Sequence, residues 1–252
     1  MVRITRRRLL AAVGGIGAAA GTGSIAADAL ARPPLEQHAV GRPTSAATIE
    51  SDAPPQIAVS WREIINGSVT ETSDLQVDGD TGALGLLVDH ELMPGDSGSV
   101  TMRVRLLERP NQSTSPAEIH LFAVLLNSDE NGLTEPERAA GDRTPETGEL
   151  DDTLQVRIWR DDGIFAGHGT WDSIPVVGDT LIESGTLRAV TDALTDGRVL
   201  PIDGQTCLSP AASPETFVSF RWSCPLSAGN QIQSDSVAFQ IGFVPRRCDN
   251  PD

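Results

Sequence analysis

An acidic segment with the sequence "NSDENGLTEPE", residues 127–137, holds the side chains best suited to bind a hard cation. Oxygen-bearing side chains alternate ahead of Gly132, as in the first half of a calcium loop, because calcium takes about six to eight oxygen ligands around a tight turn. The twelfth position, counted from Asn127, is Arg138, where an EF-hand needs a bidentate glutamate. The segment is therefore not an EF-hand. Two interpretations remain: a divalent-ion site of another kind, or a solvated acidic turn. The candidate ligands are Asn127, Asp129, Asn131, Glu135 and Glu137.

Motifs that carry catalysis are missing from the sequence. It contains neither the H-E-x-x-H motif of metallopeptidases nor a G-x-S-x-G nucleophile elbow. The four histidines are scattered singly, and the three cysteines, Cys207, Cys224 and Cys248, show no C-x-x-C spacing, so no zinc site is predicted. We therefore predict no enzyme activity and no cofactor, with calcium at residues 127–137 as the open exception.

The first 31 residues have the organisation of an export signal. A basic "TRRRLL" segment precedes a glycine- and alanine-rich stretch, and "ALA" at residues 29–31 fits a cleavage site, with Ala29 and Ala31 at its small positions. Adjacent arginines, Arg6 and Arg7, favour the twin-arginine route, which carries folded proteins. An uncleaved anchor is the alternative, although many glycines make this a poor membrane span. We expect an extracellular or cell-surface protein with no membrane span after cleavage.

The charge of the chain is strongly negative, with 35 acidic and 19 basic residues and a formal net charge of −16. Nucleic-acid binding is not expected, because phosphate contacts need clustered positive charge. Every basic residue is arginine, and the composition is typical of proteins adapted to molar salt, where repulsion between carboxylates is screened. An ordinary acidic protein from a GC-rich genome is the alternative. Two N-x-S/T acceptors for N-glycosylation begin at Asn66 and Asn111.

The elements that must position these residues are predicted to be short strands. Residues 32–56 are rich in proline, alanine, serine and threonine and are interpreted as a tether or donor segment. From residue 57 to 252, apolar and polar residues alternate over short segments separated by turn residues, as in Val237, Phe239, Ile241 and Phe243 near the end. Strands are expected at residues 57–61, 84–92, 99–108, 117–127, 154–160, 217–224 and 236–244.

Residues 184–197 differ, because their apolar residues are three and four positions apart, which favours a helix. The sequence therefore predicts an all-β fold, a jelly-roll-like antiparallel β-sandwich with one short inserted helix.

Several segments, in order, resemble one family. They are "VSWREIINGS" (59–68), "LMPGDSGSVTMRVRLLERP" (92–110), "LLNSDENGLTEPE" (125–137), "GELDDTLQVRIWRDDG" (148–163) and "GNQIQSDSVAFQIGFVPRRC" (229–248). Together they resemble the camelysin/TasA-like secreted biofilm-matrix fibre proteins, in the SipW-associated form of halophilic archaea. The resemblance implies a jelly-roll-like sandwich, export, and homopolymeric extracellular or pilus-like filaments, in some members built by donation of an N-terminal strand. The metallopeptidase label of the family has no matching motif here.

The resemblance also bears on the cysteines and on the N-terminal segment. It marks Cys224 as extra, so a disulfide between Cys207 and Cys248 would hold the terminal strand; unpaired thiols are the alternative. The donor-strand candidate carries Ile49, Ile57 and Val59, and a disordered spacer is the alternative. The predicted function is a secreted filament or matrix subunit. The alternatives are a monomeric surface domain that binds a glycan or calcium and, less supported, a camelysin-type metallopeptidase.

Overall fold

The computed structural model describes residues 55–73, 76–77, 82–88, 92–110, 114–163, 166–171 and 178–248. The predictions that fall outside these residues concern the signal at Arg6, Arg7, Ala29 and Ala31, the donor residue Ile49 and the glycosylation acceptor Asn111. None of the described helices is long and apolar enough to cross a membrane.

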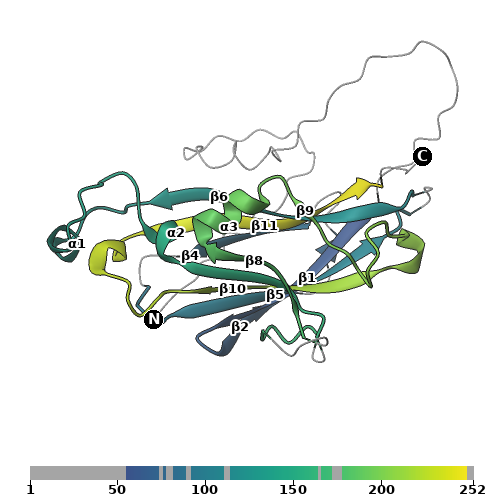
Figure 1. Ribbon diagram of the computed structural model, residues 1–252, viewed down its shortest axis with the longest axis horizontal. Coiled ribbons are helices and arrows are strands. Elements are labelled where there is room, and N and C mark those ends of the chain that lie inside the picture. The colour runs from purple at the N-terminus through teal and green to yellow at the C-terminus, as the bar shows by residue number, and fades with distance from the viewer. Residues whose placement is uncertain are drawn as a thin grey trace, which may run out of the picture.

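Two antiparallel sheets face each other and form the two layers of a β-sandwich (Figure 1). The larger sheet has the order β2 (Ser68–Thr72), β1 (Gln56–Ile65), β5 (Ser97–Leu107), β10 (Glu215–Ser223), β7 (Gln155–Arg160) and β8 (Thr180–Thr186), and β3 (Gln76–Val77) also pairs with β1. The smaller sheet has the order β4 (Gly82–Val88), β11 (Ser236–Arg247), β6 (Ala117–Asp129) and β9 (Arg198–Val199). The predicted all-β sandwich is confirmed.

The path of the chain between the sheets is that of a jelly roll. From β4 to β7, and again from β8 to β11, each successive strand belongs to the opposite sheet. Hairpins within one sheet are therefore few, and most pairings join strands that are distant in sequence. This connectivity brings the end of β6 next to the start of β11, where the candidate site lies.

Alternation along the strands explains the core. In β11, Val237, Phe239, Ile241 and Phe243 are all 0% exposed, as their period of two predicts. In β5 the residues Val100, Met102, Val104 and Leu106 are buried, and the arginines between them lie on the outer face. One continuous apolar core fills the space between the two sheets.

Three short helices interrupt the strands, where the sequence predicted one. The predicted helix is α3 (Leu187–Leu194), and it begins three residues later than expected because residues 184–186 belong to β8. Thr186 caps it by accepting a hydrogen bond from the Ala189 N–H, 3.2 Å away. The other two are α1 (Glu135–Ala140) and α2 (Leu150–Thr153), and single 3₁₀ turns occur at η1 (Pro210–Ala212) and η2 (Asn230–Ile232).

The donor-strand prediction needs a correction, because two of its residues belong to the sandwich itself. Ile57 pairs with Leu106 and Val59 with Val104 in the ladder between β1 and β5, and Ile57 is completely buried. Withdrawing them would remove β1 from between β2 and β5 in the larger sheet. A donor segment, if this chain has one, ends before Gln56.

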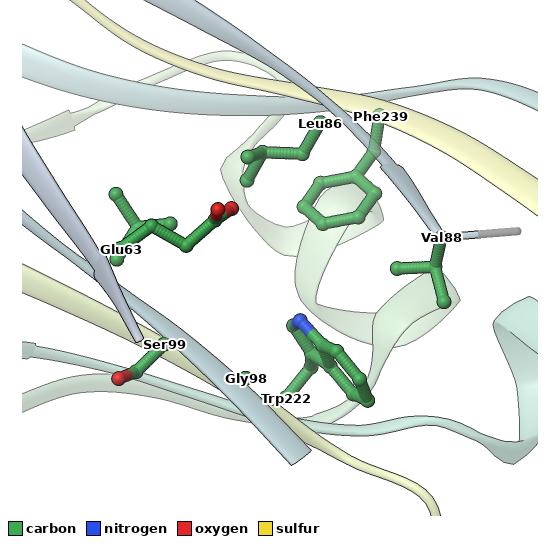
Figure 2. Close-up of a pocket in the computed structure, with 8 residues that line it drawn as sticks. Glu63, Leu86, Val88, Gly98, Ser99, Trp222 and Phe239 are labelled. Carbon is green, nitrogen blue, oxygen red and sulfur yellow. The ribbon is translucent and has the colours of Figure 1, made fainter. Parts of the chain in front are cut away.

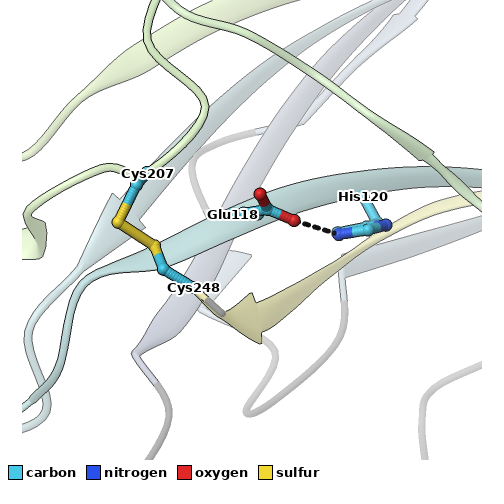
Figure 3. The surroundings of a disulfide bond; sticks show 4 residues. All are labelled: Glu118, His120, Cys207 and Cys248. Atoms are coloured by element: carbon cyan, nitrogen blue, oxygen red, sulfur yellow. Dashed lines mark hydrogen bonds and ion pairs between the residues drawn. A yellow bond between two sulfur atoms is a disulfide. The ribbon is translucent and has the colours of Figure 1, made fainter. Parts of the chain in front are cut away.

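The disulfide prediction is confirmed, and Figure 3 shows the bond between Cys207 and Cys248. Cys248 directly follows β11, and Cys207 lies in the segment between β9 and β10, beside the start of β6. The bond therefore fastens the last strand to a neighbouring segment 41 residues earlier. Cys224 is a free, buried cysteine, and burial raises the pKa of its thiol.

Glu63 is an exception to the apolar core. It lies opposite Val100 on the inner face of β1, is 4% exposed, and accepts a 2.7 Å hydrogen bond from Thr70 Oγ1. Its carboxylate points into a small cavity of about 10 Å³ between the sheets (Figure 2). Gly98 lies beside the cavity. A side chain would not fit at this position, because a Cβ there would come within 2.6 Å of the Trp222 indole. The cavity is large enough for at most about one water molecule.

Candidate metal centre

A group of carboxylates gathers at the end of the sandwich that carries α1 (Figure 1). We call it the acidic cluster, and it consists of Glu130, Glu137, Asp142, Glu149 and Asp235. Oxygen atoms of Glu130, Glu137 and Asp235 lie within 4.8 Å of one another, and so do oxygen atoms of Glu130, Asp142 and Glu149. Glu130 is common to both groups, so the two form one continuous set of oxygens.

Four segments of the chain supply the acidic cluster. Glu130 directly follows β6, and Glu137 lies in the first turn of α1. Asp142 and Glu149 lie on the connection between α1 and α2, and Asp235 directly precedes β11. Because β6 and β11 are hydrogen-bonded neighbours, Glu130 and Asp235 meet although 105 positions separate them.

Four carboxylate oxygens of the cluster are buried and have no hydrogen-bond partner. Asp235 is 0% exposed, Asp142 8% and Glu130 9%, so these side chains are withdrawn from water. A buried polar atom without a partner costs free energy, more so when the group is charged. A ligand that supplies positive charge at this point would remove that cost. The four atoms are Glu130 Oε2, Asp142 Oδ2, Glu149 Oε2 and Asp235 Oδ1.

No arginine neutralises the cluster among the described residues. The neighbouring Asp151 shows the contrast: it is also fully buried, but the Arg188 guanidinium lies 2.6 Å from its Oδ2 and Ser128 Oγ donates to its Oδ1 at 3.0 Å. Buried charges in proteins are paired or bind metal ions. Asp151 is paired, and the acidic cluster is not.

Glu137 is held in its ionised form by hydrogen bonds. Burial by itself would raise its pKa, but hydrogen bonds from Ser234 and Thr134 outweigh that effect and lower the pKa to about 2. Ser234 N–H donates to Glu137 Oε1 at 2.8 Å, Ser234 Oγ lies 2.6 Å from the same oxygen, and the Thr134 N–H donates to Oε2. These bonds tie the first turn of α1 to the segment before β11.

Asp235 is in the opposite situation. Burial, followed by contact with the Glu130 side chain, raises its pKa to about 8. Its Oδ2 accepts a 2.7 Å hydrogen bond from the Glu149 N–H. Gly148 makes this approach geometrically feasible, because a Cβ at that position would lie 2.8 Å from the Asp129 carbonyl oxygen and 2.9 Å from Asp235 Cγ.

Asp142 and Glu149 complete the cluster on the side of the α1–α2 connection. Hydrogen bonds from the backbone and hydroxyl of Thr144 to Asp142 Oδ1, at 2.8 and 2.7 Å, lower the pKa of Asp142. Burial raises the pKa of Glu149, and the charges of Asp142 and Glu130 add to that shift. Like charges at this separation disfavour simultaneous ionisation unless a cation lies between them.

The chemistry of the donors points to a hard divalent cation. All five side chains offer carboxylate oxygens, which suit calcium or magnesium, and no sulfur or imidazole nitrogen belongs to the groups found in the described residues. Ligands from four separate chain segments suit calcium, whose coordination is flexible, better than magnesium, which demands near-ideal octahedral geometry.

The structure brings few of the candidate ligands from the sequence together. Of its five candidates only Glu137 joins the cluster. Asn127 and Asp129 are exposed at the end of β6 and hydrogen-bond to each other, and Glu135 is exposed. Asn131 donates to Ser234 O at 2.8 Å and to Ser236 Oγ at 2.9 Å, so its amide fastens the loop.

The residues that the sequence analysis missed are Glu130, Asp142, Glu149 and Asp235. Glu130 is inside the predicted segment, but counting alternate positions passes over it. Asp142 and Glu149 follow the segment by five and twelve positions, and Asp235 lies far from it; no local pattern marks any of the three.

Asn66, the glycosylation acceptor that the structure describes, is exposed in the turn between β1 and β2. Its Nδ2 donates to Asp96 Oδ1 at 2.9 Å, and its Oδ1 accepts from the Ser97 N–H at 2.9 Å. The amide therefore already joins two turns, and whether it carries a glycan stays a prediction.

Comparisons with known proteins leave the family open: no protein-family model, curated protein or solved structure matches this chain. The resemblance to the biofilm-matrix fibre proteins therefore stays a prediction from motifs.

Proposed function

We propose that this chain is an exported structural β-sandwich protein that binds calcium at the acidic cluster and uses the ion to close the α1 end of the fold. The observation that carries this proposal is the set of four buried carboxylate oxygens, from four residues, that have no partner in the described structure. The same observation favours a stabilising role over catalysis.

The expected contribution of the ion follows from the segments it would join. The cluster draws on the end of β6, on α1, on the α1–α2 connection and on the start of β11. An ion bound only in the folded state stabilises it by RT ln(1 + [L]/Kd), about 2.7 kcal/mol at one hundred times the Kd. We therefore expect the free energy of unfolding to increase as the calcium concentration outside the cell rises.

The test is a calcium titration followed by isothermal calorimetry and by thermal unfolding, at constant ionic strength. We expect saturable binding and a melting temperature that rises with calcium. Glu130→Gln should abolish both effects, since Glu130 belongs to both groups of oxygens. Glu135→Gln is the matched control, because Glu135 is an exposed acid in the same segment. Equal calcium responses in the wild type and in Glu130→Gln would refute the site.

We also propose homotypic assembly into extracellular filaments, favoured by one observation about the edges of the fold. All five residues of β2 are exposed, and β2 pairs only with β1 among the described strands. An edge of this kind offers main-chain donors and acceptors to a strand from another copy. Since Ile57 and Val59 belong to β1, the donor would come from residues 32–55.

Electron microscopy of the purified mature protein at high salt tests assembly. Filaments of the intact chain, and only monomers after deletion of residues 32–53, would support donation by that segment. A monomeric intact chain would favour the alternative of a surface domain that acts alone, and filaments that persist in the deletion variant would locate the contact elsewhere.

A further inference from the structure

A groove on the outer face of the larger sheet is separate from the acidic cluster. It is lined by arginine and tryptophan side chains and not by carboxylates. Its volume is about 410 Å³, within the range of about 300–1,000 Å³ that is usual for ligand pockets. Strands β7, β8 and β10 form the floor, and the loop after β7 contributes one wall. The residues that matter here are Arg157, Arg221, Trp159, Trp171 and Ser184.

Two arginines of the groove face each other without a carboxylate partner. Arg157 in β7 and Arg221 in β10 are directly paired in the ladder, and both are exposed. Neither forms an ion pair with a described residue. Like charges directly opposite each other destabilise a sheet. In a chain with 35 acidic residues, this arrangement leaves positive charge available for an external anion.

Two other arginines of the larger sheet do have a carboxylate partner. Arg103 and Arg105 on β5 both bind the Glu215 carboxylate, with Nη2 to Oε2 distances of 2.7 and 2.5 Å. In the groove, by contrast, two arginines are paired with each other across the ladder and share no carboxylate of the described residues.

Two tryptophans form the apolar part of the groove. Trp159 and Trp171 meet edge to face with ring centroids 5.9 Å apart and an interplanar angle of 83°. The Arg157 guanidinium lies 5.2 Å from the centroid of the Trp171 ring, which orients both groups. Trp159 is 0% exposed, and its Nε1 has no hydrogen-bond acceptor in the described structure.

The loop that leads to Trp171 is held in place before any ligand arrives. The Asp161 carboxylate accepts hydrogen bonds from the Gly167 N–H at 3.0 Å and the Gly169 N–H at 2.7 Å. From the other side, Arg62 Nη2 donates to the carbonyl oxygens of Gly167 and His168 at 3.0 and 2.7 Å. Pre-organisation of this kind lowers the entropic cost of binding.

We propose that this groove binds a uronic-acid-containing saccharide. A carboxylate fits the guanidinium pair, because arginine binds it through two parallel hydrogen bonds. The apolar face of a pyranose ring can pack on the Trp171 indole, and its hydroxyl groups can hydrogen-bond to Ser184. The negative charge of the whole chain repels anions at low salt. At about 1 M salt the screening length falls to about 3 Å, so the affinity depends on the contacts within the groove.

The experiment is a fluorescence and calorimetric titration of the full mature protein in about 1 M KCl with calcium held constant. The probes are trigalacturonate, the neutral maltotriose and sodium sulfate. We expect saturable binding of trigalacturonate, with quenching or a shift of tryptophan emission, and no saturable binding of maltotriose or sulfate. Because short uronates do not gel with calcium, the response reports the protein alone.

Three variants assign the binding to the groove. Arg221→Gln should weaken trigalacturonate binding about tenfold or more, as expected for the loss of a charge-assisted hydrogen-bonded pair. Arg221→Lys should recover part of it, because the charge stays while the bidentate geometry is lost. Arg247→Gln is the matched control: this exposed arginine ends β11, far from the groove lining, and should bind as the wild type does.

Three results would overturn the proposal: no binding of trigalacturonate, equal affinity for maltotriose, or an unchanged affinity in Arg221→Gln. Competition by sulfate at the same concentration as trigalacturonate would also overturn it, because the site would then recognise an anion without the sugar. Circular dichroism of each variant confirms that a loss of binding is not a loss of fold. The calcium proposal does not enter this test.

Discussion

The Oδ2 atom of Asp235 accepts a 2.7 Å hydrogen bond from the backbone N–H of Glu149, a residue 86 positions earlier in the chain. The other oxygen of the same carboxyl, Oδ1, is buried without a partner. One oxygen thus fastens the α1–α2 connection to the start of β11, and the other is available to a cation. A single side chain serves the fold and the candidate metal centre at once.

Replacing Asp235 with asparagine separates these two roles. In Asp235→Asn the amide oxygen can still accept from Glu149, and the amide nitrogen can donate to the unpartnered oxygen of Glu130. Without calcium we expect this variant to be more stable than the wild type by about 1–3 kcal/mol, because the amide is neutral in this buried site without having to bind a proton. With saturating calcium the order should reverse. Urea unfolding in EGTA and in calcium measures both.

A variant that is less stable than the wild type in both conditions would show that the Asp235 carboxylate contributes to folding without a cation. Glu135→Gln, an exposed acid of the same end, should change neither measurement.

The pH dependence of stability should carry the signature of Asp235. Its pKa in the folded protein, about 8, lies above the ordinary value of 3.8, so the folded state holds a proton that the unfolded state releases. Its contribution to stability is therefore full below about pH 4 and is lost as the pH rises through 8. In EGTA we expect the free energy of unfolding of the wild type, relative to Asp235→Asn, to decrease over this window.

Calcium should change that profile, because the ion binds the ionised carboxylate. We expect calcium affinity to increase from pH 6 to pH 8, with protons released on binding. Calorimetry in buffers of different ionisation enthalpy counts those protons. A calcium affinity that does not vary with pH would contradict the assignment of Asp235 as a ligand.

Gly148 should tolerate no side chain. A Cβ at this position would lie within 3 Å of both the Asp129 carbonyl and the Asp235 carboxyl, and both are held by strand pairing or hydrogen bonds. We expect Gly148→Ala to weaken calcium binding about tenfold or more and to lower stability by about 1–3 kcal/mol. Gly132→Ala is a useful comparison, because a Cβ there meets nothing within 4 Å, although its φ of +105° also costs some strain. Its calcium affinity should stay close to that of the wild type.

Removing the disulfide should destabilise the protein without changing the fold. The bond closes a sequence separation of 41 residues, for which the chain-entropy model gives about 4 kcal/mol. We expect the double variant Cys207→Ser, Cys248→Ser to lose roughly that amount in denaturant unfolding. Cys224→Ser is the control for lost thiols, and the buried Cys224 should react with a thiol reagent only after unfolding. A double variant as stable as the wild type would show that strand pairing alone holds β11.

The strands with strong alternation could be predicted from sequence because their pattern is local. β11 and β5 each bury one side of a regular period-two pattern. β2 was missed because all its residues are exposed, and β8 because its last residues read as the start of a helix. Strand alternation does not tell which strands become neighbours. The pairing of strands determines which carboxylates meet in the candidate metal centre.

The candidate ligands show the same limit. Glu137 could be found because it lies in an acidic run with a glycine, a local signal. Asp235 stands alone in a serine-rich turn, and only the pairing of β6 with β11 brings it to Glu130. The groove of Arg157 and Arg221 is similar, since the two arginines are far apart in sequence and only the register of β7 and β10 places them together.

The position of β11 in the smaller sheet has a consequence for synthesis. It lies between β4 and β6, and it follows every other described strand in sequence. Until β11 has been synthesised, β4 and β6 have no strand between them, and the inner face of the larger sheet has no complete layer to cover it. During synthesis the earlier strands therefore expose apolar surface that only β11 can help to cover, and this is the interval in which the domain is most prone to aggregate.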